Sequence, residues 1–335
     1  MNALVTGGGG FLGRAVLRLL RERGDTVRSF SRGAYPALDA LGVEQVRGDV
    51  ADADAVAAAA RECEIVFHVA AKAGVWGPWD EYYRANVVGT ANVVAACRKH
   101  GIRRLVFTSS PSVTFAGVDQ NGVNESEPYP TKFLAHYPHT KAVAEQAVLA
   151  ANGRGLATVA LRPHLIWGPG DPHLVPRLVE RARAGKLRRI GREPKLVDTT
   201  YIENAARAHL QAGDRLREGS PVAGRAYFVS QGEPEPLWDF INRILEAAGL
   251  PPVTKGVPAG VALFAGSMLE SSYRLLRLRR EPPMTRFVAR QLSTAHWFDL
   301  TAARRDFGYE PGVSTAEGLD RLRQWFRSHA NDASG

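Results

Sequence analysis

The sequence predicts an α/β fold in which a doubly wound parallel sheet carries a smaller, mostly helical C-terminal portion. Short apolar runs alternate strictly with amphipathic stretches before about residue 165, which is typical of a parallel sheet with helices on both faces. After about residue 170 helices dominate, interrupted by Pro-containing loops such as 233–236. We therefore expect a first domain at 1–170, with segments near 195–230 returning to its sheet, and mostly a cap at 171–335.

The expected elements follow the chain in order. Strands are expected where apolar runs are short, at 3–6, 26–30, 44–47, 65–69, 105–108 and 157–161. Amphipathic helices are expected at 11–23, stopped by Gly24, and at 52–61, 81–100 and 141–151. The stretch 258–278 is expected to form an amphipathic cap helix with a basic end.

Composition excludes several classes of protein. The 335 residues are 45% hydrophobic and 23% charged, an ordinary globular mixture. Cys63 and Cys97 are too few for a disulfide scaffold or a Cys-based zinc finger, and we expect no metal site. The longest apolar stretch, 260–269, is far shorter than the ~20 residues of a membrane-spanning helix. The N-terminus lacks the pattern of a secretion signal, so we expect a cytoplasmic protein.

The net charge of +9 reflects either solvated helix faces or an anionic partner such as nucleic acid, a membrane surface or a small ligand. No zinc-binding spacing or RNA-stacking motif accompanies the basic stretches, so nucleic acid is not an expected partner. The basic end of the cap helix and a second basic run, 177–192, either face solvent or meet anions. Peripheral membrane contact through the cap and a homodimer both stay open.

A glycine-rich turn predicts a dinucleotide site of the Rossmann type. Gly7, Gly10 and Gly13 are spaced G-x-x-G-x-x-G directly after the first expected strand, and Phe11 and Leu12 open the first helix. Glycines permit a tight turn and a close approach of the backbone to a pyrophosphate, which the helix N-terminus attracts. The context, more than the three glycines alone, favours this interpretation.

The end of the second strand indicates which nicotinamide cofactor binds. NAD sites usually carry an acid there, which holds the ribose 2′-hydroxyl. This chain has Ser31 and Arg32 instead, and an arginine can pair with a 2′-phosphate. We therefore expect NADP(H), with NAD(H) as the alternative if Arg32 is only a surface residue.

The third and fourth strands add further candidate cofactor contacts. Asp49 and Val50 follow the third strand, and Asp49 either accepts from the adenine amino group or caps the next helix. Ala70 and Ala71 follow the fourth strand with side chains small enough for a cofactor to pass closely. His68, within that strand, is expected to be a packed core histidine.

A Tyr-x-x-x-Lys motif predicts acid/base chemistry on a hydroxyl or carbonyl. Tyr137 and Lys141 are four residues apart, which places them on one helix face, and Pro138 suits a first helical turn. The ammonium is expected to favour phenolate and lower the tyrosine pKa from about 10. Ser110 follows a strand at its carboxyl edge and is placed to hydrogen-bond the same substrate oxygen.

Together these segments resemble the extended short-chain dehydrogenases/reductases over nearly the whole chain. The matching segments are 6–13, 86–90, 108–110, 137–141, 162–169 and 198–204. The resemblance implies that Tyr137 is the acid/base and that Lys141 lowers its pKa and holds the nicotinamide ribose. It also implies that Ser110 orients the substrate and that Pro163 lies beside the nicotinamide. Ser31 departs from the NAD-using members, which carry an acid there.

Within this family the chain is most similar to the 3β-hydroxysteroid dehydrogenase branch. The segments 112–119, 125–128 and 171–176 resemble sterol-4-carboxylate 3-dehydrogenases, whereas 71–77 resembles bacterial 2-alkyl-3-oxoalkanoate reductases of olefin synthesis. We therefore expect an NAD(P)-dependent oxidoreductase that interconverts the 3-hydroxyl and 3-ketone of a hydrophobic β-hydroxy or β-keto acid. A 4-carboxysterol is the first choice of substrate, and a 2-alkyl-3-oxoalkanoate is the alternative.

Two other functions use the same fold. A nucleotide-sugar epimerase or dehydratase uses the same residues, but Arg32 and the apolar cap argue against it. A non-catalytic NADP-sensing module can dispense with the Tyr/Lys pair, which is intact here. The hydrophobic substrate is expected in an apolar pocket whose lining includes Trp76, Trp79, Trp167 and Phe115.

Overall fold

The computed structural model describes residues 1–332 and confirms the predicted fold class. A central sheet of seven parallel strands has the order β12-β7-β5-β4-β1-β2-β3. Because β1 lies inside the sheet and the chain winds outward from it to both edges, the sheet is doubly wound. Its strands are β1 (Asn2–Thr6), β2 (Thr26–Ser31), β3 (Glu44–Arg47), β4 (Ile65–His68), β5 (Arg104–Thr108), β7 (Ala157–Pro163) and β12 (Arg225–Val229).

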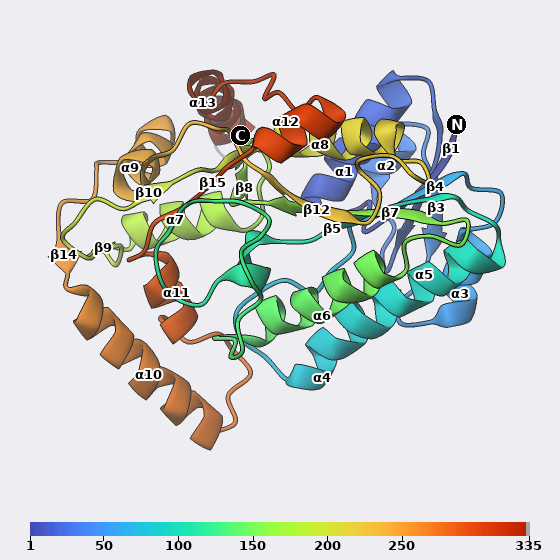
Figure 1. Ribbon diagram of the computed structural model, residues 1–335. Helices are drawn as coiled ribbons and strands as arrows, with labels where there is room; N and C mark the ends of the chain where they lie inside the picture. Colours follow the sequence, from blue (N-terminus) through green and yellow to red (C-terminus); the bar gives the residue numbers. More distant parts are fainter. Residues whose placement is uncertain (333–335) are drawn as a thin grey trace.

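Helices cover both faces of this sheet (Figure 1). One face packs against α1 and α8, and the other packs against α3, α5 and α6, so that two apolar cores form, one on each side. These helices are α1 (Phe11–Glu22), α3 (Ala53–Ala59), α5 (Gly89–Lys99), α6 (His136–Ala150) and α8 (Ile202–Arg215), with the short α2 (Pro36–Asp39) beside β3. β7 is buried at every position, as expected of a strand covered on both faces.

The register of the sheet brings several predicted site residues to one edge. Thr6 at the end of β1 lies opposite His68 at the end of β4. Thr108 at the end of β5 lies opposite Leu161 of β7, two residues before Pro163. Because all seven strands are parallel, their carboxyl ends share this edge, which is where open α/β sheets bind ligands.

The C-terminal portion is largely helical, as predicted, but its strands also form a small mixed sheet with β6 of the first domain. Its helices are α7 (Leu174–Arg183), α9 (Leu237–Ala247), α10 (Ala259–Leu275), α11 (Arg286–Gln291), α12 (Thr301–Phe307) and α13 (Thr315–Asp332). Four short strands pair in the order β13 (Glu235–Pro236), β10 (Leu196–Val197), β15 (His296–Phe298) and β6 (Gln120–Val123). Two further pairs are β8 (Ile166–Trp167) with β11 (Thr200–Tyr201), and β9 (Arg189–Ile190) with β14 (Gly256–Val257). Within residues 1–332, no helix is long and apolar enough to cross a membrane.

Two predicted helices differ from those in the structure. The helix predicted at 81–100 begins at Trp79 with α4 (Trp79–Tyr82) and passes through a π-helical stretch (Tyr83–Val88) before α5. The helix predicted at 141–151 begins earlier, at His136, so that Tyr137 and Pro138 lie in its first turn. Proline is tolerated there because the first helical N–H groups have no intrahelical acceptor.

Candidate active site

The glycine-rich turn between β1 and α1 leaves room only for glycine at two of its three motif positions. Gly7 has a φ of +72°, and a Cβ there would lie 2.8 Å from the Ala70 backbone. A Cβ at Gly13 would collide with the carbonyl of Gly7. Gly10 is the N-cap of α1, and no side chain caps that end of the helix. Phe11 and Leu12, predicted contacts, form the first helical turn with its N–H groups directed at the turn. The turn is therefore a tight cradle of backbone groups, as the sequence predicts.

The second strand ends beside this cradle. The Ser31 hydroxyl accepts a hydrogen bond from the Gly9 N–H at 3.2 Å. Arg32 is exposed and has no ion pair within the described residues. Arg47, which the sequence analysis did not select, lies opposite Ser31 in the β2–β3 register and is likewise exposed and unpaired there. The edge therefore presents two free guanidinium groups beside Ser31 and no carboxylate on either strand end.

A second residue missed from sequence lies over the same turn. A Cβ at Gly9 would collide with the Tyr35 ring, so this aromatic ring packs directly on the glycine backbone. Tyr35 is partly exposed and is held by its backbone, which exchanges two hydrogen bonds with the Gln45 amide at 2.9 and 3.1 Å. The contact depends on the loop between β2 and β3, for which the sequence offers no motif.

The predicted residues after β3 belong to a loop that begins beside the end of β2, since the Gly48 N–H donates to the Ser31 carbonyl at 3.0 Å. Asp52, not Asp49, caps α3, since its carboxylate accepts from the N–H groups of residues 54 and 55. Asp49 instead accepts from the Ala51 N–H at 3.0 Å, which corrects the helix-capping alternative. The carbonyl of Val50 accepts from the Asn92 amide at 3.0 Å, which ties this loop to α5.

The end of β4 is held by a buried hydrogen-bond chain. Ala70 lies against Gly7 and donates its N–H to the Thr6 hydroxyl at 3.2 Å, and Ala71 beside it is exposed. His68 contacts the hydroxyls of Thr6 and Thr90 at 2.7 and 3.0 Å and is fully buried. Burial lowers its pKa to about 3, so it is a neutral core histidine, as predicted.

Tyr137, Lys141 and Ser110 come together at the ends of β5 and β7. Tyr137 and Lys141 lie one turn apart on α6, and Ser110 follows β5. The Lys141 ammonium donates to the Thr108 carbonyl at 2.6 Å and lies 3.9 Å from the centre of the Phe107 ring. Ser110 exchanges a hydrogen bond with the Ser112 hydroxyl at 2.9 Å. Pro163 is buried at the end of β7, where the Ser109 N–H donates to Leu161 of that strand at 2.6 Å.

The electrostatics of this group differ from the prediction. Lys141 was expected to lower the pKa of Tyr137, but burial raises that pKa above 10, and the neighbouring Ser110 hydroxyl offsets only part of the effect. Burial also lowers the pKa of Lys141 to about 7, opposed by the carboxylate of Glu145. The expectation considered the attraction between ammonium and phenolate but omitted the cost of removing either charge from water.

Behind Lys141, the same helix face carries a buried ion pair that the sequence analysis did not select. Glu145 is fully buried and binds Arg162 of β7 through three contacts of 2.6 to 3.2 Å. The Tyr129 hydroxyl donates to the same carboxylate at 2.7 Å. The spacing of Tyr137, Lys141 and Glu145 at every fourth position is the signal that could have identified it.

The four aromatic residues expected in an apolar pocket divide into two groups. Trp167 and Phe115 belong to the core: Trp167 is fully buried against Tyr201 and Phe240, and Phe115 packs on Phe287 and His296. Trp76 and Trp79 are partly exposed. Trp79 lies 4.9 Å from the His139 ring of α6, near Tyr137, so only these two remain candidates for a pocket lining.

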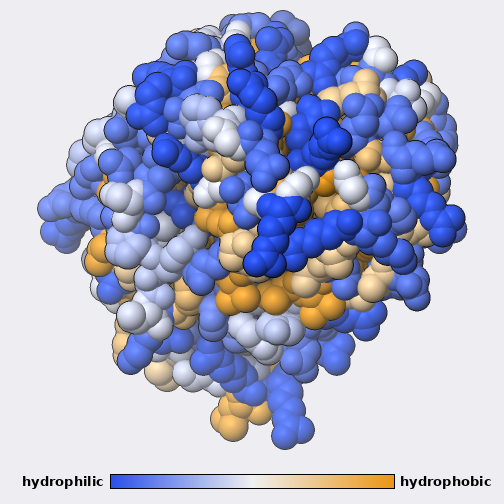
Figure 2. All heavy atoms as spheres, turned by 45° about the vertical axis from the view of Figure 1, so that its right-hand side comes forward, coloured by the Kyte–Doolittle hydropathy of each residue, from blue (hydrophilic) through white to orange (hydrophobic). Residues whose placement is uncertain are grey.

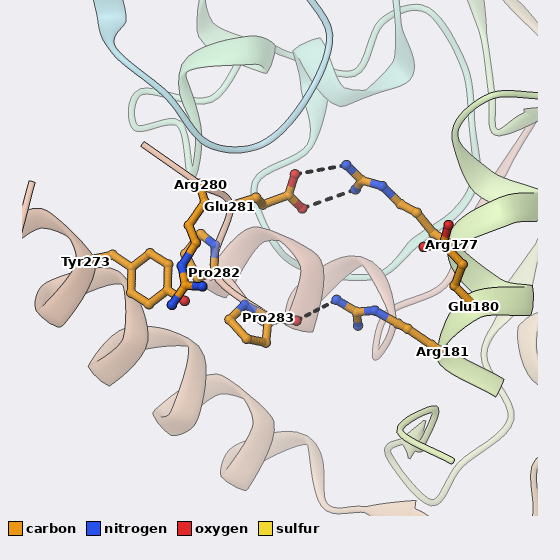
Figure 3. Close-up of a pocket in the computed structure, with 8 residues that line it drawn as sticks. All are labelled: Arg177, Glu180, Arg181, Tyr273, Arg280, Glu281, Pro282 and Pro283. Carbon is orange, nitrogen blue, oxygen red and sulfur yellow. Dashed lines mark hydrogen bonds and ion pairs between the residues drawn. The ribbon is translucent and has the colours of Figure 1, made fainter. Parts of the chain in front are cut away.

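Trp76, on the loop between β4 and α4, contacts α10 and the segment that follows it. Its indole donates to the Leu278 carbonyl at 3.1 Å, and its ring meets Tyr273 of α10 edge-on at 6.2 Å. A pocket of about 400 Å³ lies next to Tyr273, between α7 and the segment that follows α10 (Figure 3). Across it, Arg177 of α7 binds Glu281 through contacts of 3.1 and 2.9 Å, and Arg181 donates to the Pro283 carbonyl at 2.7 Å. Arg177 and Arg181, at the start of the basic run 177–192, thus contact the segment after α10, while the Arg177 side chain stays 57% exposed.

This fold and site define a dinucleotide-binding α/β protein with a Tyr–Lys–Ser group at the carboxyl edge of its sheet. The model of the 3-beta hydroxysteroid dehydrogenase/isomerase family matches residues 4–256. The chain belongs to that family and is an oxidoreductase, as the sequence predicts.

Curated relatives span almost the whole chain. A 2-alkyl-3-oxoalkanoate reductase from Stenotrophomonas maltophilia is 56% identical over 96% of this chain and 98% of its own. One from Shewanella oneidensis is 53% identical over 96% of this chain and 85% of its own. A decarboxylating sterol-4-alpha-carboxylate 3-dehydrogenase from Mus musculus is 34% identical over 98% of this chain and 91% of its own.

Solved structures share the fold at lower identity. UDP-glucose 4-epimerase of Thermus thermophilus, in complex with NAD, is 26% identical with a TM-score of 0.73, over 98% of this chain and 99% of its own. MoeE5, in complex with UDP-glucose and NAD, is also 26% identical, with a TM-score of 0.75, over 98% of this chain and all of its own. Both support the Rossmann-type architecture.

Proposed function

We propose that this chain is an NADPH-dependent reductase of 2-alkyl-3-oxoalkanoates. The observation that carries the proposal is the Tyr137–Lys141–Ser110 group at the sheet edge, in a chain at least 53% identical to two such reductases. From the sequence alone, we expect the sterol acid as the first choice of substrate and the alkyl acid as the second. The identities reverse that order, because the sterol relative stands at only 34%.

The residues present fit a nicotinamide dinucleotide. Gly7 and Gly13 leave no room for a side chain, so the backbone can approach a pyrophosphate closely at the uncapped end of α1. Under this proposal Asp49 and Val50 contact the adenine, and Ala70 and Ala71 line the path of the cofactor toward Pro163. When bound, the reduced nicotinamide supplies the hydride that adds to the substrate carbon.

The preference for NADP(H) rests on charge at the end of β2. Arg32 and Arg47 are exposed and unpaired in the described part of the chain, next to Ser31. Guanidinium groups bind phosphate strongly, whereas no carboxylate is present there to hold a free 2′-hydroxyl. NAD(H) binds more weakly under this proposal.

The chain's own residues move the proton. The Tyr137 hydroxyl donates its proton to the oxygen at C3 while a hydride adds to C3, so that the ketone becomes an alcohol and the net proton comes from solvent. Because burial raises the pKa of Tyr137, the phenol is protonated at neutral pH, which is the form that a ketone reductase needs. Ser110 hydrogen-bonds the same oxygen, and Lys141 holds the nicotinamide ribose.

The test measures nicotinamide absorbance in the direction of alcohol oxidation. β-Keto acids lose carbon dioxide readily, so the stable 2-alkyl-3-hydroxyalkanoate is offered with NADP⁺ or NAD⁺, beside a 4-carboxy-3β-hydroxysterol and UDP-glucose. We expect turnover of the alkyl acid, faster with NADP⁺. Tyr137→Phe should lower the turnover rate at least about 10²-fold, because the variant lacks the acid/base group. Its affinity for NADPH should stay unchanged. Turnover of the sterol or UDP-glucose alone, or an active Tyr137→Phe variant, would contradict the proposal.

A further inference from the structure

Helix α10 exposes an apolar stripe, which the exposed Ser271 and Ser272 interrupt before its last turn. Val261, Phe264, Met268 and Leu275 are 55%, 69%, 55% and 84% exposed. At about 100° per residue, these four positions lie within an arc of about 60° along the helix. Leu276, directly after the helix, is 65% exposed and extends the stripe. We name these five residues the α10 stripe.

The opposite face of α10 is fixed by close packing, so the stripe cannot rotate into the core. Ala262, Gly266 and Glu270 are buried at every fourth position. A Cβ at Gly266 would lie 2.8 Å from the carbonyl carbon of Thr285, so the helix touches the backbone just before α11. The Glu270 carboxylate accepts from the N–H and side chain of Arg286 at 2.7 and 2.9 Å.

The stripe lies at the margin of the molecule. In Figure 1, α10 stands apart from the sheet, its C-terminal end forming the lowest point of the protein. Figure 2 shows the molecule turned about the vertical axis, so the lowest point of Figure 1 is also the lowest point there. Hydrophobic atoms lie next to hydrophilic atoms at this lowest point. A protruding ridge of this kind fits a deformable surface better than the concave groove that a small ligand needs.

Cations lie at both ends of the stripe. Arg277, Arg279 and Arg280 follow the helix and have no carboxylate within ion-pair distance in the part of the chain that the structure describes. At the other end, exposed Lys255 directly precedes β14, which pairs with β9 and so brings Arg189 alongside. The only acid within α10 is the buried Glu270.

We propose that α10 lies in the interface of an anionic phospholipid bilayer, with the α10 stripe among the acyl chains and the flanking cations on phosphate groups. Burial of the apolar stripe and attraction of the cations each contribute to such binding. A second copy of the chain is a poorer occupant, because it carries the same cations around the same stripe and a net charge of +9. This inference does not depend on the substrate of the enzyme.

The pocket next to Tyr273 lies on the other side of α10. Tyr273 is about 150° around the helix from the middle of the α10 stripe, and most of the remaining pocket lining is charged: Arg177, Glu180, Arg181, Arg280 and Glu281. The proposal therefore concerns attachment of the protein to a bilayer and not an entry route for the substrate.

The test is flotation of the full-length chain with vesicles of phosphatidylcholine, with and without phosphatidylglycerol. We expect binding to the anionic vesicles only, weakened by salt because exposed charges are screened. Phe264→Ser with Leu275→Ser should weaken binding at least about tenfold, and Arg277→Glu with Arg280→Glu should do the same. Matched controls are Val118→Ser, an apolar side chain 58% exposed outside α10, and Arg103→Glu, on the loop before β5.

Three results would overturn the proposal. The wild type could fail to bind anionic vesicles, the control variants could lose as much vesicle binding as the stripe variants, or the affinity for vesicles could stay unchanged when the stripe is altered. Light scattering decides between lipid and a second copy: a wild-type dimer that becomes a monomer with the stripe changes would make the stripe a dimer contact. Circular dichroism of each variant confirms that it is folded.

Discussion

Glu145 of α6 and Arg162 of β7 form an ion pair that is almost completely buried, 0% and 2% exposed, directly behind the candidate active site. The guanidinium also lies against the rings of Tyr129 and Phe228, at 5.8 and 5.1 Å. This pair joins the helix that carries Tyr137 and Lys141 to the strand that ends at Pro163. It therefore links the position of the acid/base group to that of the sheet edge.

Removal of one partner should be far more costly than removal of both. Glu145→Ala leaves the Arg162 charge buried without compensation, and we expect a loss of about 3–5 kcal/mol in the free energy of unfolding. The double variant Glu145→Ala, Arg162→Met should recover much of that loss. Urea denaturation measures both. Glu22→Ala, which breaks an exposed pair with Arg18, is the control and should cost less than about 1 kcal/mol. A buried single variant no worse than this control would show that the pair is energetically neutral.

Local chemistry made much of the site predictable. The glycine turn and the Tyr-x-x-x-Lys motif each need a few residues at short spacing, so the sequence displays them completely. Ala70 was also selected from the sequence, because a strand end next to a backbone cradle requires short side chains, and its backbone lies against Gly7. The structure places all of these at one edge of the sheet.

The rest depends on relationships between distant segments. Arg47 comes next to Ser31 only through the β2–β3 register, and Tyr35 reaches Gly9 only through the fold of a loop. The pKa of Tyr137 depends on desolvation, which no spacing reveals. The π-helical stretch in the predicted helix 81–100 was not predicted, because its residues have ordinary helical propensity.

Lys141 should make stability depend on pH. Its pKa is about 7 in the folded protein, below the 10.5 of an ordinary lysine. Between these values the unfolded chain binds a proton that the folded chain does not, so stability rises with pH in this range and is lowest below it. From about pH 7.5 to about pH 9.5, wild type should gain up to ~1.4 kcal/mol per pH unit relative to Lys141→Met. Urea denaturation of the protein without cofactor measures this, and Lys72→Met, partly exposed, should retain the wild-type slope. Parallel curves for wild type and Lys141→Met would contradict it.

Gly7 should tolerate no side chain, because a Cβ there would collide with the Ala70 backbone. Comparison with Gly24 separates this collision from the strain of a positive φ. Gly7→Ala meets both a φ of +72° and the Ala70 backbone at 2.8 Å. Gly24→Ala meets a φ of +86° with open space around it. We expect about 1–2 kcal/mol of destabilisation at Gly24 from the left-handed conformation alone, and about 1–3 kcal/mol more at Gly7 from overpacking. Thermal or urea unfolding measures the difference, and only Gly7→Ala should also lose NADPH binding. Equal costs at the two positions would mean that the turn relaxes around the new methyl group.

Arg32 should distinguish the two cofactors. Loss of a charge-assisted hydrogen bond to a phosphate costs about 1.5–3 kcal/mol, so Arg32→Ala should weaken NADPH binding by about 10- to 100-fold and leave NADH almost unchanged. Arg47→Ala should act in the same direction, and Ser31→Asp should reverse the preference because its carboxylate accepts from the 2′-hydroxyl and repels the 2′-phosphate. Fluorescence titration with both reduced cofactors measures the constants. Arg61→Ala, on the loop before β4 at the opposite edge of the sheet, is the matched control. If Arg32→Ala weakens both cofactors equally, Arg32 does not read the 2′-phosphate, and the NADP(H) preference must come from elsewhere or be absent.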